Sequence, residues 1–130
     1  MHNTLLQTLR RVPLFSRAKG GFYEALAGDF LSRQGLKKIR YNYRARFGEI
    51  DLIAEDGEVL VFVEVRYRQD AGHGSPAATV DFRKQRKIIR TAQYFLQKYG
   101  LTNRMPCRFD VIGITGKPGA TEIQWIKNAF

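Results

Sequence analysis

The apolar residues of the chain follow two different spacings. Recurrence at three and four residues predicts helices over residues 22–34 and 80–99. Alternating patterns and short continuous apolar runs predict five strands. These strands lie at residues 37–46, 104–115 and 121–127, with two more inside residues 47–68. The predicted order is helix, three strands, helix and two strands, which indicates an α/β fold.

Each predicted helix has an apolar stripe that should face a core. In the first helix the stripe consists of Phe22, Leu26, Ala27, Phe30 and Leu31. In the second it consists of Phe82, Ile89, Ala92, Phe95, Leu96 and Tyr99. Gly35 is the expected C-terminal cap of the first helix, and Asp81 or Thr79 is the expected N-cap of the second.

Two acidic residues interrupt the apolar strands within residues 47–68. Asp51 lies between Ile50 and Leu52, and Glu64 lies between two valines. Burying a carboxylate without a partner costs several kcal/mol. A folded chain therefore needs a reason to keep these acids, and a metal ion beside a phosphodiester would supply one.

The turn between these two strands determines which residues meet. Asp56-Gly57 is a strong hairpin signal, and either a two-residue loop there or a four-residue loop over residues 55–58 places Glu49 opposite Glu64. Asp51 then faces Phe62 and is a diagonal neighbour of Glu64, roughly 7–8 Å away, so one cation could bridge both carboxylates. A three-residue loop would instead put the two acids on opposite faces.

Alternation along the hairpin separates a polar face from an apolar one. The polar face carries Glu49, Asp51, Glu64 and Arg66. The other face carries Val59, Val61, Val63 and Val65 and should be buried. The preceding strand should show Ile39, Tyr41 and Tyr43 on one face and basic residues on the other, as an edge strand would.

Charge adds a preference for a polyanionic partner. The 130 residues include 22 Lys and Arg against 12 Asp and Glu, a formal net charge of +10. Neutralising phosphates releases counterions, so this excess favours nucleic acid. The candidate phosphate contacts are Arg44, Arg46, Arg68, Arg83, Lys87 and Arg90. For the residues on the second helix, a solvated basic face is the alternative.

The length predicts one domain over residues 20–130, preceded by a basic extension over residues 1–19. Cys107 is the single cysteine, which excludes an intrachain disulfide, and we expect it to be buried. No apolar run reaches the ~18 residues of a membrane span, and no signal peptide is recognisable. We therefore expect a cytoplasmic protein without a membrane partner. A homodimer is compatible with the sequence, but no self-complementary patch establishes one.

The segments GEIDLIA, LVFVEVRYR, KQRKI, CRFDVIGI and WIKNAF carry a resemblance that covers roughly residues 20–130. Their order, with an acid in one strand and Glu-x-Arg in the next, resembles the PD-(D/E)XK nuclease superfamily. More narrowly, the chain is similar to the YraN family, whose members are predicted endonucleases distantly similar to archaeal Holliday junction resolvases. The resemblance implies a restriction-endonuclease-like αβββαββ core, with a mixed central sheet flanked by helices.

The resemblance also implies site roles. Asp51 and Glu64 match metal-binding acids, to which the Val65 carbonyl could add a third oxygen for Mg²⁺ or Mn²⁺. Glu24 matches an acid of the first helix, although the residues alone favour a carboxylate that suits the helix dipole. Arg66 occupies the position of a lysine, and Gln85 that of a polar helix residue. A guanidinium stabilises negative charge but cannot act as a base.

Three functions follow as hypotheses. The first is a metal-dependent endonuclease that hydrolyses phosphodiester bonds in DNA, including structured or branched DNA. The second is a catalytically inactive nucleic-acid-binding module on a nuclease fold, which Arg66 favours. The third is a basic scaffold that binds an acidic protein.

Overall fold

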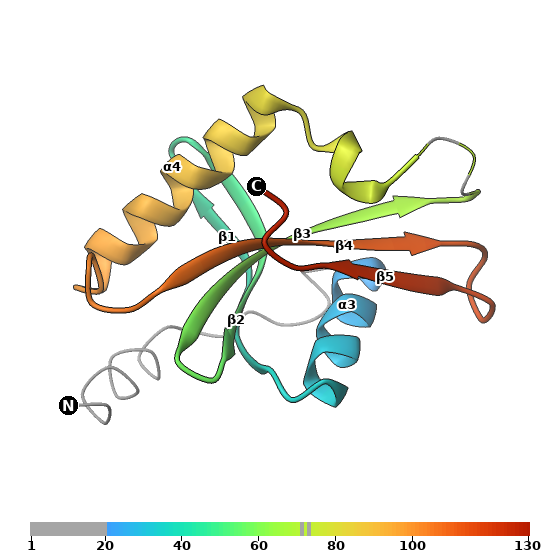
Figure 1. Ribbon diagram of the computed structural model, residues 1–130, viewed down its shortest axis with the longest axis horizontal. Coiled ribbons are helices and arrows are strands. Elements are labelled where there is room, and N and C mark those ends of the chain that lie inside the picture. Colours follow the sequence, from blue (N-terminus) through green and yellow to red (C-terminus); the bar gives the residue numbers. More distant parts are fainter. Residues whose placement is uncertain (1–20, 71, 73) are drawn as a thin grey trace.

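The computed structural model describes residues 21–70, 72 and 74–130, so the extension predicted over residues 1–19 lies outside the described residues. The chain order is helix, three strands, helix and two strands, as predicted, with one short 3-10 helix in addition (Figure 1). The elements are α3 (Phe22–Arg33), β1 (Lys37–Ala45), β2 (Gly48–Asp56), β3 (Val59–Arg68), η1 (Pro76–Thr79), α4 (Phe82–Lys98), β4 (Cys107–Thr115) and β5 (Glu122–Ile126).

The strands form one mixed sheet in the order β1-β2-β3-β4-β5. All neighbouring pairs are antiparallel except β3 and β4, which are parallel and are joined by the crossover that contains α4. β1 is an edge strand, as its charges predicted. Among the described residues, no helix is long and apolar enough to span a membrane.

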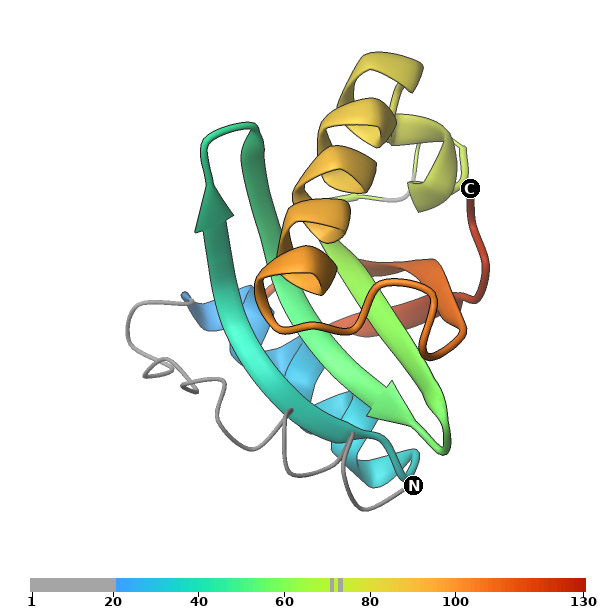
Figure 2. The ribbon, with the colours of Figure 1, turned by 90° about the vertical axis from the view of Figure 1, so that its left-hand side faces the viewer.

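Helices α3 and α4 cover opposite faces of the sheet (Figures 1 and 2). Each face has its own hydrophobic cluster, because α4 contributes Ile88, Ala92 and Phe95 to one cluster and α3 contributes Ala27 and Leu31 to the other. The valine stripe of β3 packs against the α3-side cluster, as predicted. Its members are Val59, Val61, Val63 and Val65.

The helix ends follow the local chemistry of the sequence. Gly35, with φ of 95°, donates its N–H to the Ser32 carbonyl at 3.0 Å, and Leu36 donates to the Leu31 carbonyl at 3.0 Å. These two bonds form a Schellman motif, which ends α3 where the glycine predicted. At α4, the Asp81 carboxylate accepts the Lys84 N–H at 2.8 Å, so Asp81 rather than Thr79 is the cap.

Three residues predicted to be buried are exposed instead. Phe22 and Phe82 stand at the first positions of their helices, and their side chains are 56% and 70% exposed. A residue in the first turn of a helix can extend past the edge of the sheet that the rest of the helix covers. Cys107 is also exposed, at the start of β4. Conversely, Ile88 is buried although the predicted stripe contained Ile89.

The hairpin register differs from the prediction by one step on each strand. Asp56 pairs with Val59, so the loop is Gly57-Glu58, with Gly57 at φ of 60° as the first position of a type II′ turn requires. Phe62 consequently lies opposite Ile53 rather than Asp51. The valine stripe and Glu64 keep their predicted faces. Alternation along β2 is interrupted at Asp51, however, because Ile50 packs in the α4-side cluster whereas Leu52 packs in the α3-side cluster.

The predicted single face of Ile39, Tyr41 and Tyr43 is wrong. Ile39 and Tyr43 pack in the α4-side cluster, whereas Tyr41 packs in the α3-side cluster. Two irregularities cause the change, namely a register shift between Lys38 and Arg40 and a positive φ of 50° at Asn42. Each of them interrupts strict alternation along the strand.

Candidate functional site

The sheet opens into a fork at Asp51 and Glu64. Pairing between β2 and β3 runs from Asp56–Val59 to Leu52–Val63. Beyond that point β2 stays paired with β1 as far as Gly48, while β3 stays paired with β4 as far as Arg68. Figure 2 shows the β1–β2 pair separating from β3 under α4. The two predicted metal-binding acids are therefore the first residues on either side of the opening.

Asp51 on β2 contacts the backbone of β3 across the start of the fork. Its Oδ2 accepts a 2.8 Å hydrogen bond from the Val65 N–H. Burial, and after it the negative charge of Glu64, raise the pKa of Asp51 to about 8, although the hydrogen bond from Val65 lowers it. At neutral pH this carboxyl group is therefore protonated in most molecules unless a cation binds beside it.

Glu64 is almost fully buried, with 4% of its side chain exposed, and it has two cationic partners. Arg66 Nε lies 3.4 Å from Glu64 Oε2, and Lys84 Nζ lies 3.3 Å from the same oxygen. The Arg66 guanidinium also donates to the Thr79 carbonyl at 3.3 Å, which ties η1 to the site. Arg66 is thus beside the acids, as predicted.

Glu24 approaches the fork from α3. Burial raises the pKa of its carboxyl group, and the negative charges of Glu49 and Glu64 add to the increase. Glu49 itself forms a 2.7 Å ion pair with Arg44 at the β1–β2 end of the opening. Four acids predicted for this region therefore lie close enough for their charges to repel one another, namely Glu24, Glu49, Asp51 and Glu64.

Lys84, rather than the predicted Gln85, contacts the acids from α4. The Gln85 amide donates to the Val80 carbonyl at 3.0 Å, and no described hydrogen bond or ion pair joins Gln85 to the acids. Lys84, which the prediction missed, contacts Glu64. The missing signal was the burial of Ile88, because residues four apart share a helix face and Lys84 therefore points towards the sheet.

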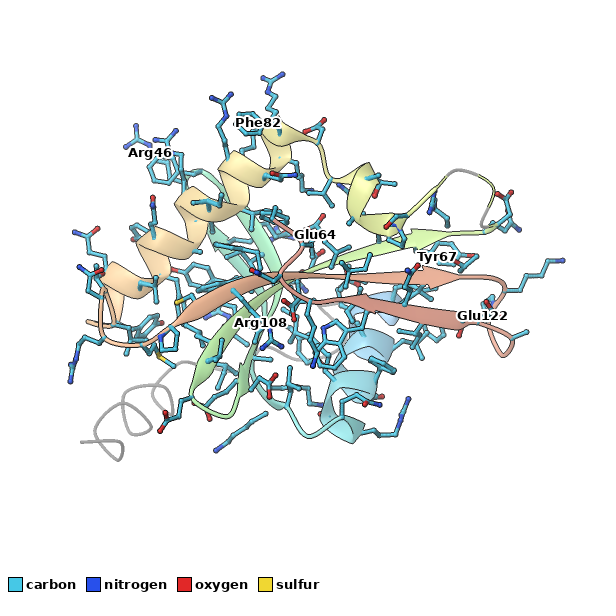
Figure 3. All side chains as sticks on the ribbon, in the orientation of Figure 1. Arg46, Glu64, Tyr67, Phe82, Arg108 and Glu122 are labelled. Atoms are coloured by element: carbon cyan, nitrogen blue, oxygen red, sulfur yellow. The ribbon has the colours of Figure 1, made fainter. Side chains whose placement is uncertain are left out.

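Five of the six basic residues proposed for phosphate contacts lie at two places. Arg83, Lys87 and Arg90 are exposed along α4, and Arg44 and Arg46 are exposed at the β1–β2 turn. Arg90 stacks over the Phe47 ring at 4.2 Å, which brings the two places side by side, and Figure 3 shows Arg46 beside α4. Arg68 is partly buried and donates to the Gly74 carbonyl at 2.6 Å.

The donor set at the fork suits a cation that needs few protein ligands. Within the described residues, no three His, Cys, Asp or Glu side chains are arranged as a preformed metal site. Asp51 and Glu64 offer carboxylate oxygens, and Mg²⁺ usually takes one or two carboxylates, with waters and substrate phosphates for the rest. A divalent cation would also relieve the repulsion that raises the pKa of Asp51.

The fold and the fork define a mixed α/β protein with paired acids at the opening of its sheet. The chain belongs to the uncharacterised protein family UPF0102, which is the YraN family, and the sequence model of that family matches residues 23–114. Relatives named as UPF0102 proteins are similar over most of their length. One from Pseudomonas syringae pv. syringae is 52% identical, over 82% of this chain and 88% of the relative. One from Chromohalobacter salexigens is 48% identical, over 88% and 92% respectively.

Proposed function

We propose that this protein is a metal-dependent endonuclease that hydrolyses phosphodiester bonds in DNA, on a core of the PD-(D/E)XK type. The observation that supports this most strongly is the fork, where Asp51 and Glu64 stand on either side of the opening and the pKa of Asp51 rises to about 8. Burial and mutual repulsion make such an acidic pair costly unless it serves a cation.

Mg²⁺ or Mn²⁺ would be held by Asp51, Glu64 and the Val65 carbonyl. When bound, such an ion lowers the pKa of a coordinated water and offsets phosphate charge. The Asp51–Val65 hydrogen bond fixes the carboxylate beside Glu64, where an ion could bind to both acids. Glu24 would add a carboxylate beyond the ion's own ligands, where it can accept a hydrogen bond from water.

The cations at the fork would act on the substrate. Lys84 and Arg66 both lie within 3.4 Å of Glu64 Oε2, so a phosphate at the fork would meet an ammonium and a guanidinium at once. Both groups offset the charge that develops on phosphate oxygens. Lys84 thereby supplies the lysine that is absent at the Arg66 position, and it comes from α4 instead of β3.

DNA would lie across α4 and the β1–β2 turn. Arg83, Lys87 and Arg90 on the helix and Arg44 and Arg46 on the turn form one exposed basic surface beside the fork. A basic surface that follows a phosphate backbone binds without reading sequence. Cleavage would then depend on the shape of the DNA rather than on its bases.

One observation favours a second function, a nucleic-acid-binding module without catalysis. Glu64 is already neutralised by Lys84 and Arg66, so its charge is balanced without a metal ion. A silent module would bind DNA in a salt-sensitive manner, would keep this binding in Asp51→Ala, and would show no metal site in calorimetry.

A cleavage screen tests the proposal. Purified protein is incubated with Mg²⁺ or Mn²⁺ and with duplex, single-stranded, flap and four-way junction DNA. We expect cleavage of at least one substrate, lost in Asp51→Ala and Glu64→Ala and kept in Glu122→Ala, which removes an exposed acid at the start of β5 far from the fork (Figure 3). Equal cutting by all four proteins would identify a contaminant, and no cutting together with DNA binding would favour the silent module.

A further inference from the structure

A row of exposed side chains follows α4 on the side away from the sheet. Its members stand four residues apart and therefore share one face of the helix. They are Phe82, Arg86, Arg90 and Tyr94, and all four are exposed. Figure 3 shows Phe82 on the outer side of α4, away from Glu64. We refer to these four residues as the outer row.

Each arginine of the outer row lies over an aromatic ring. The Arg86 guanidinium is 5.2 Å from the centre of the Phe82 ring, one turn earlier on α4. The Arg90 guanidinium is 4.2 Å from the centre of the Phe47 ring, which comes from the β1–β2 turn. A guanidinium is attracted to a ring face and still has its in-plane N–H groups available as donors. The rings therefore restrict the positions of the two cations without using their hydrogen bonds.

The two arginines of the outer row have no acidic partner in the part of the chain that the structure describes. Arg44 and Arg108 form ion pairs with carboxylates at 2.7 and 2.9 Å. Among the described residues, by contrast, no acid pairs with Arg86 or Arg90. Helix α4 itself contains six lysines and arginines and no aspartate or glutamate. The positive charge on this side of α4 is therefore available to an anionic partner.

The surroundings of the outer row favour a phosphate backbone as that partner. Arg83 and Lys87 are exposed on the neighbouring row of α4, and Arg46 is exposed at the β1–β2 turn. Side chains one helical turn apart, with about 5–6 Å between their Cβ atoms, can contact different phosphates of one strand. An arginine can also form two parallel hydrogen bonds with a phosphate. A polyanion with repeated phosphates therefore matches this surface.

We propose that Phe82 and Phe47 are positioning residues, which hold Arg86 and Arg90 ready to contact phosphates of the DNA backbone. Arg86 thereby joins the basic surface, in which the sequence analysis placed Arg90 but not Arg86. This inference rests on the proposed function and deepens it, because it assigns the backbone to the outer side of α4. Each ring reduces the conformational freedom that its arginine loses on binding, so it raises affinity without adding charge.

A salt titration of duplex DNA binding, made in EDTA, separates positioning from charge. Arg86→Ala removes one phosphate contact, so the slope of log affinity against log salt should fall by about 0.9. Phe82→Leu keeps that charge, so its slope should equal that of the wild type while its affinity falls about 3-fold at every salt concentration. Arg86→Lys should likewise keep the slope and lose about 3-fold, since an ammonium is a point charge without a planar group to stack.

The double variant shows whether the ring acts through the arginine. In the Arg86→Ala background, Phe82→Leu should have no further effect on affinity. Tyr94→Leu is the matched control, because Tyr94 is 42% exposed on the same row and no cation of the described residues lies over its ring. It should change neither the affinity nor the slope.

Three results would overturn the inference. If the loss from Phe82→Leu persists in the Arg86→Ala background, the ring contacts DNA by itself and does not position the arginine. If the slope of Arg86→Ala is unchanged, the backbone lies elsewhere, and in both cases the proposed nuclease at the fork still stands. Binding of poly-glutamate without any binding of duplex DNA would overturn the inference and the proposed function together. The expected binding responses without cleavage of any DNA would refute the nuclease and support the outer row.

Discussion

The Val65 N–H donates a 2.8 Å hydrogen bond to Oδ2 of Asp51, across the point where β2 and β3 stop pairing. A side chain thus takes the place of a backbone carbonyl as the acceptor for a strand N–H. The fork stays open without leaving that donor unsatisfied. The same bond holds the carboxylate beside Glu64, so the feature that ends the pairing also assembles the acidic pair.

The pH dependence of stability should reveal the acidic pair. The pKa of Asp51 is about 8 in the folded chain, against an ordinary 3.8, so the unfolded chain loses this proton first as pH rises. The stability that the protonated group contributes is fully present below about pH 4 and disappears as pH rises through about 8.

Asp51→Asn removes this dependence. In EDTA, its free energy of unfolding should exceed that of the wild type by roughly 2 kcal/mol at pH 8, allowing for relaxation and solvent around the carboxylate, and the gap should shrink towards pH 4. Urea unfolding at several pH values measures the gap. Glu122→Gln, which changes an exposed acid, should leave the profile of the wild type intact. A gap that is constant with pH would contradict the raised pKa.

Lys84 should affect metal binding and cleavage in opposite directions. Lys84→Ala removes a cation 3.3 Å from Glu64, so the carboxylate becomes more available and Mn²⁺ should bind a few-fold more tightly. Cleavage should nevertheless fall by about 100-fold, because a charge that offsets the phosphate is lost. Calorimetry and initial rates measure the two effects. Lys98→Ala, at the other end of α4, should change neither, and a parallel loss of both would assign Lys84 a structural role.

The basic surface should determine the salt dependence of DNA binding. Each of Arg83, Lys87 and Arg90 that contacts one phosphate should contribute about 0.9 to the slope of log affinity against log salt. The triple alanine variant should therefore lower the slope by about 2 to 3 on a duplex. Binding titrations at four salt concentrations measure it. Lys117→Ala, in the exposed β4–β5 turn, is the control, and an unchanged slope in the triple variant would place DNA elsewhere.

The stability of the fold with a buried Asp110 carboxylate should depend on the positive charge of Arg108. Asp110 is fully buried and accepts hydrogen bonds from Arg108 Nε, Trp125 Nε1 and the Asn128 N–H. Arg108→Met leaves this carboxylate without its counter-charge and should cost about 3 kcal/mol in urea unfolding. Lys127→Met, which removes a cation 4.4 Å from the Trp125 ring, should cost less than about 1 kcal/mol. Equal losses would contradict a special role for Arg108.

The faces of the β3 residues and the end of α3 were predictable because they follow from local periodicity. The valine stripe, the cap at Gly35 and the proximity of Asp51 to Glu64 all depend on residues close in sequence. The hairpin register was not predictable from the sequence, since Asp56-Gly57 and Gly57-Glu58 are both acceptable two-residue loops. Both loops keep the valine stripe and Glu64 on their predicted faces, so the two acids meet with either loop and the identity of the opposite residues differs.

Tertiary contacts account for what sequence reasoning missed. Ile88 and Ile89 both fit a helical stripe, and only packing against the sheet selects Ile88 and turns Lys84 towards Glu64. The face change at Tyr41 depends on the backbone of Asn42, which adopts a positive φ that asparagine tolerates but does not require. Gln85 was placed by resemblance, and its amide is instead used by the Val80 carbonyl.

The connectivity of the sheet has a consequence for the order of folding. β1, β2 and β3 are consecutive antiparallel strands, so they close short loops, whereas the parallel β3–β4 pair requires the whole crossover to close first. Asp51 and Glu64 belong to the local part, and Lys84 arrives with the crossover. The two negative charges therefore meet when only Arg66 is present to offset them and Lys84 is not yet in place. We expect the early three-strand unit to form faster in acid, where one of the two acids carries a proton.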